Sequence, residues 1–341
     1  MQIEDFDYYL PDELIAQEPL QERDKSRMLV LNRSTKQWKD DFFYNFPEYF
    51  DDKDLIVFNN TKVFPARLIG RKNTGAKIEI FLLRQVSNQV WEALAKPARR
   101  LKNGTALIFD SNFKATILEK KEDGTFIVSF DFEGEFWQCL EKLGKTPLPP
   151  YIKREDSVED KQRYQTVYAK KLGSVAAPTA GLHFTERILE AIKKRGATCI
   201  EITLHVGYGT FEPVRVKDVE KHKVLPEECE ITEETAEILN RAKADKKRIV
   251  AIGTTTTRAL EFFATKEGAI KAGKTIVDLT VTPGYQFKFV DAMLTNFHLP
   301  KSSLLIMVST FAGRELIMSA YRHAVEQKYR FYSYGDCMLI L

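Results

Sequence analysis

Six short β-strand patterns between residues 66 and 148 constrain the fold more than any other feature of this sequence. Each is rich in β-branched and aromatic residues, and tight turns with Gly, Asn, Ser or Asp separate them. The six segments are ARLIGRK, AKIEIFLLRQV, VWEALAKP, TALIFD, FKATILEK and TFIVSFDF. Strands this short, joined by turns this tight, predict a small all-β barrel or sandwich.

Strand and helix patterns alternate on both sides of this region, which indicates an α/β domain. Strand patterns occur at 54–61, 173–177, 199–206, 248–252, 275–281 and 337–341, and helical patterns at 186–195, 258–266, 302–311 and 314–327. The stiff segment PLPPY at 147–151 marks a domain boundary. We therefore predict a discontinuous α/β catalytic domain at 1–64 and 150–341, with a mixed sheet flanked by helices, and an inserted β-barrel domain at 65–149.

Composition excludes several classes of protein. No run approaches the roughly 18 apolar residues of a membrane span, and the acidic start MQIEDFDYYLPDEL does not match a secretory signal. The four cysteines and five histidines lack the spacing of zinc sites or disulfide frameworks. A net charge of +3 leaves nucleic-acid binding open. We expect a cytoplasmic protein without membrane contact or metal.

Polar segments follow the predicted strands, and ligands of open α/β sheets bind at the carboxyl ends of such strands. These segments are Asn59–Thr61, Pro178–Phe184, His205–Phe211, Gly253–Arg258, Pro283–Gly284 and Thr295–Leu299. Most contain a histidine, or a glycine beside hydroxyl groups. We expect them to converge on one site.

The turn at Pro178–Phe184 has the features of a ligand-binding loop. Gly181 permits a close backbone approach, and Thr185 can cap the helix that begins at Glu186. His183 then lies beside unpaired amides. The alternative is a loop in which the imidazole satisfies backbone groups.

Two more strand ends suggest a flat or anionic ligand. Gly207 and Gly209 let backbone approach a ring on which Tyr208 or Phe211 stacks, although a tight turn alone is the alternative. No third glycine follows, so a dinucleotide fingerprint is absent. The segment GTTTTR resembles an anion-binding turn but is no P-loop, and it leaves Arg258 free to bind a carboxylate.

Basic residues of the β region are candidates for contact with RNA phosphates. They are Arg67, Arg71, Lys96, Arg99 and Arg100. A solvated charged face is the alternative for each.

Several long motifs, in order along the chain, strongly resemble the QueA family, the S-adenosylmethionine:tRNA ribosyltransferase-isomerases of queuosine biosynthesis. They are AAPTAGLHFT, TLHVGYGTFEPVR, IGTTTTRALE, LTNFHLPKSSLL and YRFYSYGD. The similarity extends over essentially the whole chain, and the family is similar in architecture to the domains predicted above.

The resemblance implies an activity and its partners. The ribosyl part of S-adenosylmethionine is transferred and isomerised onto 7-aminomethyl-7-deazaguanine at the wobble position of tRNA. Epoxyqueuosine forms, and adenine and methionine are released. We expect S-adenosylmethionine to be a co-substrate, no other cofactor to be bound, and the chain to be a monomer.

Within this resemblance the reaction suggests roles for residues. A base must remove a proton from the acidified 5′ carbon, the leaving adenine needs donors, and the sulfonium and carboxylate need partners. The candidate acids and bases are His183, His205, Glu212, His298 and Asp336. The expected substrate-binding residues are Asn60, Thr179, Gly181, Gly207, Tyr208, Gly209, Thr210, Phe211, Arg215, Thr254, Thr255, Arg258, Asn296 and Tyr334.

Two positions depart from the family pattern. Asn60 stands where relatives usually have Asp, so this loop lacks that carboxylate. After His222, the segment KVLPEECE lacks a second histidine that the family commonly carries, which argues against an essential proton transfer there.

Two functions of other classes remain as alternatives. A non-catalytic RNA-binding protein would depend on the basic hairpin around Arg99 and Arg100 but not on His183 or His205. A nucleotide-dependent enzyme for a small molecule would act without RNA and with little dependence on salt.

Overall fold

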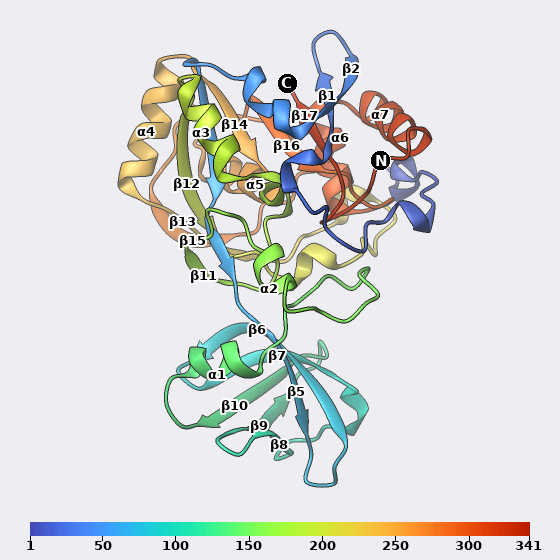
Figure 1. The fold of residues 1–341 in the computed structure, drawn as a ribbon, viewed down its shortest axis with the longest axis vertical. Coiled ribbons are helices and arrows are strands. Elements are labelled where there is room, and N and C mark those ends of the chain that lie inside the picture. Colours follow the sequence, from blue (N-terminus) through green and yellow to red (C-terminus); the bar gives the residue numbers. More distant parts are fainter.

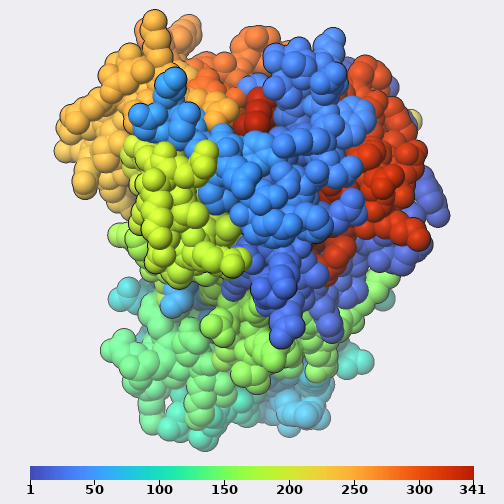
Figure 2. Space-filling model, turned by 45° about the horizontal axis from the view of Figure 1, so that its top comes forward, coloured from blue at the N-terminus to red at the C-terminus, as the bar shows by residue number.

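The computed structural model describes all 341 residues and shows two bodies of unequal size (Figure 1). The larger contains both chain ends and a nine-stranded sheet, and the smaller is a closed six-stranded barrel. Figure 2 shows the barrel as a smaller lobe, in teal and green, below the α/β body. The predicted fold class, a mixed-sheet α/β domain with a small all-β barrel inserted, is confirmed.

The nine strands of the large sheet lie in the order β15-β13-β12-β3-β14-β16-β17-β1-β2. Their bounds are β1 Arg27–Asn32, β2 Gln37–Phe42, β3 Asp54–Asn59, β12 Thr198–Leu204, β13 Glu227–Ile231, β14 Arg248–Ile252, β15 Gly273–Val277, β16 Ala292–Asn296 and β17 Cys337–Ile340. Strands β12, β3, β14 and β16 are parallel, and β17 is antiparallel to β16. The carboxyl ends of the four parallel strands therefore share one edge of the sheet with the amino ends of β17 and β1.

Other elements cover both faces of this sheet, because its central strands are apolar on both sides. All of β3 is buried: Leu55 and Val57 belong to one core, and Ile56 and Phe58 to another. The helices are α1 Phe136–Leu143, α2 Asp160–Arg163, α3 Glu186–Lys194, α4 Glu233–Ala244, α5 Thr254–Phe263, α6 Ser303–Ala312 and α7 Arg314–Glu326. None of them alone is long and apolar enough to cross a membrane; α6 and α7 reach that length and composition only as a pair, bent by 118°.

The barrel consists of the six strands that the turn pattern predicts. They are β5 Arg67–Arg71, β6 Lys77–Ser87, β7 Val90–Lys96, β8 Ala106–Asp110, β9 Phe113–Lys120 and β10 Phe126–Phe132. Alternating residues such as Ile78, Ile80 and Leu82 of β6 fill its core, and α1 adds Phe136 and Leu140. Closure leaves no open strand edge for pairing with other chains.

Two local predictions differ from the structure. The segment 173–177, predicted as a strand of the βαβ pattern, contributes only to β11 (Lys171–Ser174), which pairs with β4 (Thr61–Val63) in a separate two-stranded sheet. The four threonines after β14, predicted as a loop, form the first turn of α5. Thr256 and Thr257 donate to carbonyl oxygens one turn back, a bond that lets threonine remain in a helix.

Candidate active site

Polar loops at the carboxyl ends of the parallel strands enclose a cavity of about 550 Å³. Its wall includes residues 178–180, 210–214, 253–255 and 295–302. Four of the six predicted strand-end segments therefore meet, whereas Asn59–Thr61 and Pro283–Gly284 lie elsewhere. The volume suits a small organic ligand.

The amino end of α5 forms one part of the wall. Gly253 has a φ of +93°, a left-handed conformation that favours glycine and turns the chain from β14 into the helix. No side chain caps α5, so its first amides lack partners within the helix. Thr254 and Thr255 line the cavity beside them, and the Thr255 hydroxyl oxygen is buried without a partner. This end of the helix therefore favours a ligand that carries or develops negative charge.

His298 is the only histidine in the cavity wall. Its Nε2 lies 2.8 Å from Thr295 Oγ1, and that hydroxyl donates to the Asn296 carbonyl oxygen at 3.3 Å. Since the hydroxyl proton is used there, we assign the imidazole proton to Nε2. Nδ1 then has a free lone pair. Burial lowers the pKa of His298 to about 3, so the ring is neutral at physiological pH.

His183 does not line the cavity but contacts Asn296, which does. Its Nδ1 is 2.7 Å from Ser26 Oγ, and its Nε2 accepts from Asn296 Nδ2 at 3.2 Å. The Asn296 side-chain oxygen is buried without a partner, while its residue lines the cavity. Because both ring nitrogens are occupied, His183 orients the Asn296 amide and is not placed to act on a ligand itself.

The two buried histidines predict an acid-sensitive fold. Burial, followed by the charges of Arg23 and Arg330, lowers the pKa of His183 to about 3, as burial alone does for His298. In the unfolded chain each titrates near pH 6.5. Their stabilising effect is therefore complete above about pH 6.5, and it is lost progressively as the pH falls towards 3.

We expect the free energy of unfolding of a His183→Gln variant to fall less steeply with decreasing pH than that of the wild type. The difference in slope should approach about 1.4 kcal/mol per pH unit between roughly pH 5.5 and 4. Urea unfolding at several pH values measures both slopes, and equal slopes would contradict the prediction.

His205 lies outside the cavity. Its Nδ1 is 2.8 Å from Thr61 Oγ1, and its ring packs so closely on Gly173 that an added Cβ would lie 2.6 Å from it. Burial lowers the pKa of His205. The structure therefore does not bring His205 to the same site as His298.

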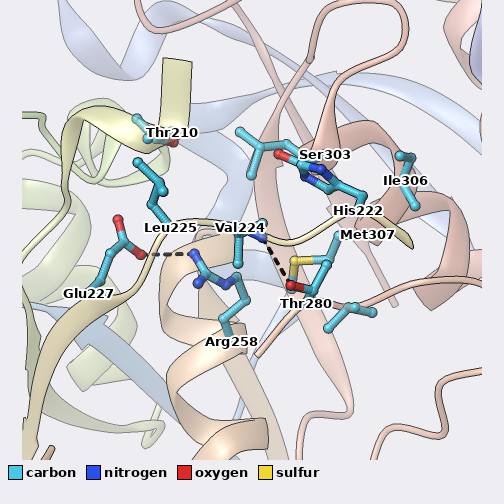
Figure 3. Close-up of a pocket in the computed structure, with 13 residues that line it drawn as sticks. Thr210, His222, Val224, Leu225, Glu227, Arg258, Thr280, Ser303, Ile306 and Met307 are labelled. Atoms are coloured by element: carbon cyan, nitrogen blue, oxygen red, sulfur yellow. Dashed lines mark hydrogen bonds and ion pairs between the residues drawn. The ribbon is translucent and has the colours of Figure 1, made fainter. Parts of the chain in front are cut away.

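Arg258 lies in a separate pocket of about 20 Å³ beside the cavity (Figure 3). Its Nη1 bonds the Glu227 carboxylate at 2.8 Å, and both residues are more than nine-tenths buried. The other Glu227 oxygen accepts from the Gly207 amide at 2.9 Å. The pair thus ties α5 to the Gly207 loop. Arg258 is held by the protein through Nε and Nη1, while its Nη2 has no partner, and its binding of a substrate carboxylate stays a prediction.

Asp336 and Tyr334 form hydrogen bonds with other groups of the protein. The Asp336 carboxylate accepts from the amides of Arg27 and Arg330, each at 2.8 Å, and burial raises its pKa. The Tyr334 hydroxyl donates to Asp160 at 3.0 Å. Neither residue lines the cavity, so the structure does not place Asp336 to protonate adenine or Tyr334 to hold the sulfonium.

Of Asn60, Glu212 and Arg215, only Glu212 is in the cavity wall, where it is the one carboxylate. Asn60 is held outside it by bonds to Thr203 at 2.7 Å and Glu201 at 3.1 Å. Arg215 is 78% exposed at its side chain and lies 4.0 Å from Glu212.

The Gly207 loop contacts both the cavity and the barrel. Thr210 and Phe211 line the cavity. Tyr208 instead lies edge-on to Phe81 of the barrel, with ring centroids 5.4 Å apart. The loop therefore joins the cavity wall to the inserted domain, and of its two predicted aromatic residues only Phe211 can stack on a ligand in the cavity.

In the loop before α3, one predicted residue lines the cavity and another is needed for packing. Thr179 lines the cavity, as predicted from its position. Gly181 is required for packing, because an added Cβ would lie 2.1 Å from the Tyr168 hydroxyl oxygen. Gly209 is similar, since its added Cβ would lie 2.7 Å from Leu225.

Sequence reasoning missed part of the aromatic wall. Tyr151 and Tyr332 line the cavity with ring centroids 3.9 Å apart, and Tyr151 lies edge-on to Phe211. Tyr332 has a φ of +75°, uncommon for a bulky residue. Both tyrosines belong to noted segments, PLPPY and YRFYSYGD, but neither segment follows a parallel strand.

The predicted RNA-binding residues lie on the barrel. Arg71, Lys96, Arg99 and Arg100 are exposed, whereas Arg67 is half-buried and pairs with Glu79 at 2.8 Å. Contact with RNA stays a prediction for all of them.

Comparison with known proteins bears on the whole chain. A family described as "Queuosine biosynthesis protein" matches residues 3–340. Proteins named S-adenosylmethionine:tRNA ribosyltransferase-isomerase from Thermoanaerobacter sp. and Syntrophotalea carbinolica are 51% and 48% identical, over 100% of this chain and of each relative. The crystal structure of an S-adenosylmethionine tRNA ribosyltransferase from Thermotoga maritima is similar, with a TM-score of 0.56 and 37% identity over 99% of this chain and 100% of that one.

Proposed function

The chain belongs to the queuosine biosynthesis protein family, and we propose on this premise that it is an S-adenosylmethionine:tRNA ribosyltransferase-isomerase. The cavity with its neutral His298 carries the proposal, because its volume suits a small organic ligand and its wall presents an unprotonated base. More finely, we propose that the acceptor is 7-aminomethyl-7-deazaguanine at the wobble position. Epoxyqueuosine, adenine and methionine are then the products.

The first chemical step is removal of a proton from the ribose 5′ carbon. We assign this proton to His298 Nδ1, the one imidazole nitrogen at the cavity wall without a partner. The transfer moves positive charge from the sulfonium centre to the imidazole and creates no additional net charge in the cavity. A buried, neutral ring is therefore a suitable acceptor even though burial depresses its pKa.

Adenine then departs with developing negative charge. Thr254 and Thr255 and the free amides at the start of α5 are the donors that the cavity offers. Donors fixed in this way stabilise charge that appears only in the transition state.

The sulfonium has complementary surroundings. Phe211, Tyr151 and Tyr332 contribute aromatic rings, whose faces attract cations, to the cavity wall, and Glu212 adds a negative charge. The amine of the modified base attacks in its unprotonated form, which a partly desolvated site favours. We propose that the exposed arginines of the barrel contact the tRNA, and that the enzyme acts as a monomer in the cytoplasm.

The proposal is tested by incubating the protein with S-adenosylmethionine and tRNA that carries the 7-deazaguanine precursor. Nucleoside mass analysis should detect the epoxide-bearing nucleoside together with free adenine. Reactions without tRNA, and with the free base in place of tRNA, are the controls. A folded protein that binds tRNA but releases no adenine would instead be the non-catalytic RNA-binding protein.

A further inference from the structure

A second polar cleft lies on the far side of the His183–Asn296 pair from the cavity. Arg23, Arg163 and His183 line it. Ser333 lines both the cleft and the cavity, so the two spaces are neighbours. The cleft measures about 20 Å³, which excludes a nucleoside and leaves space for no more than one small polar group.

The guanidinium groups here bond only to backbone carbonyl oxygens. Arg23 donates to the carbonyls of residues 162, 165 and 182, and Arg163 to those of residues 20 and 21. Neighbouring Arg330 donates to the carbonyl of Glu18. These bonds use only part of each donor set: Arg163 Nε and Arg330 Nη1 are buried without partners. None of the three forms an ion pair.

Among these three cations only Arg330 lies within the influence of carboxylates, those of Asp336 and Glu18, whereas Arg23 and Arg163 have none as a partner. After burial, the charge of Arg163 is the main cause that lowers the pKa of Arg23, to about 10. Two neighbouring acids are engaged elsewhere: Asp336 accepts two amides, and Asp160 pairs with Arg154 at 2.6 Å. Half-buried cations without a counter-ion are costly, and an anion would relieve that cost.

We propose that this cleft is an oxyanion-binding site, which holds either the methionine carboxylate of S-adenosylmethionine or a backbone phosphate of tRNA. The choice of these two candidate anions rests on the proposed function. The existence of an oxyanion site does not, because it is argued from the guanidinium groups alone. Arginine forks suit both groups. The adjoining cavity lacks such a partner, because its single cation, Lys301, is paired with Asp7 at 2.7 Å.

The site itself is tested with inorganic phosphate as the probe. At constant ionic strength and pH, replacing chloride with phosphate should raise the thermal unfolding midpoint of the wild type by about 2 °C or more, and that of Arg163→Gln much less. Arg33→Gln is the matched control. Arg33 is also half-buried and donates only to carbonyl oxygens, but it lies beside Asp291 and does not line this cleft.

Binding titrations of the protein with each substrate distinguish the methionine carboxylate from the tRNA phosphate. If the anion is the methionine carboxylate, Arg163→Gln should weaken S-adenosylmethionine binding about tenfold or more and leave tRNA binding unchanged. If it is a tRNA phosphate, tRNA binding should weaken instead, with a salt-dependence slope smaller by about one. Arg163→Lys, which keeps the charge without the fork, should weaken the same substrate by a smaller factor.

The proposal is overturned if phosphate raises the unfolding midpoint of both Arg163 variants as much as that of Arg33→Gln, and both bind each substrate within about twofold of that control. If Arg163→Gln does not fold, the same comparison with Arg163→Lys decides. Failure of the proposed function is a separate result: a wild type that releases no adenine, while phosphate still protects it through Arg163.

Discussion

A His298→Gln enzyme is expected to retain its fold and lose about 10²- to 10⁴-fold in kcat. The amide still bonds Thr295 but provides no basic lone pair at the position of Nδ1. The KM for S-adenosylmethionine should change far less than kcat, because the removed interaction acts mainly in the transition state. Adenine release over time, measured at saturating tRNA, gives both constants.

Two variants separate this role from a structural one. His323→Gln, on the surface beside Asp40, is the control for losing an imidazole and should keep nearly full activity. Glu212→Gln tests the one carboxylate of the cavity wall; it should raise KM for the sulfonium substrate more than it lowers kcat. If Glu212→Gln loses more kcat than His298→Gln, the base is the carboxylate and the assignment to His298 is wrong.

A kinetic isotope effect at the 5′ carbon provides a readout that packing defects do not produce. If proton abstraction limits the rate, deuterium at this carbon of S-adenosylmethionine should lower kcat for the wild type. A His298→Gln variant with residual activity should show a larger isotope effect than the wild type, since its proton transfer is slower still and limits the rate more completely. A defect in folding alone would leave the isotope effect of the remaining active enzyme unchanged.

The sequence predicted the edge of the sheet at which the cavity lies, and four of the six segments that meet there. Parallel strands are recognisable as apolar runs, and their carboxyl ends must share an edge, so loops such as those at Gly253 and Asn296 had to approach each other. The six-stranded barrel was predictable for the same kind of local reason, because tight turns limit the possible pairings of short strands.

The roles of individual residues were not predictable, because they depend on partners remote in sequence. His183, His205 and His298 all occupy strand-end segments, yet only contacts with Asn296, Thr61 and Thr295 decide which ring has a free nitrogen at the cavity. These contacts depend on side-chain directions that strand and helix periodicity does not specify.

Arg258 illustrates the same limit. Its position just after the threonines of α5 made it a candidate for binding a ligand carboxylate. Its partner, Glu227, is 31 residues earlier, in a segment with several acidic residues. Strand alternation places Glu227 on the buried face of Cys229 and Ile231, and Glu228 on the face that pairs with Lys274, but it does not identify Arg258 as the partner of Glu227.

That difference in burial leads to the second large prediction: Glu227→Gln should lower the free energy of unfolding by about 3 kcal/mol or more. Glutamine can still accept from the Gly207 amide, so the variant mainly removes the charge that compensates Arg258. The guanidinium would then remain buried with a free Nη2 and only the Leu279 carbonyl and a neutral amide as acceptors. Urea unfolding at neutral pH measures the loss.

Glu228→Gln is the matched control, one residue away in the same strand. Its side chain is 44% exposed and pairs with Lys274, so its removal should cost less than about 1 kcal/mol. A second test removes both members of the buried pair. Glu227→Leu with Arg258→Met should recover much of the stability lost in Glu227→Gln, because no unpaired charge is then buried.

Activity should not recover with stability in that double variant. The pair positions the Gly207 loop against α5, and these two elements present Phe211 and Thr255 to the cavity. Without the Glu227 oxygen, the Gly207 amide loses its hydrogen bond to β13, so kcat/KM is expected to remain low.

Equal losses of stability in Glu227→Gln and Glu228→Gln would show that the ion pair is not needed to hold the fold. Full activity in a stable double variant would show that it does not position the loop.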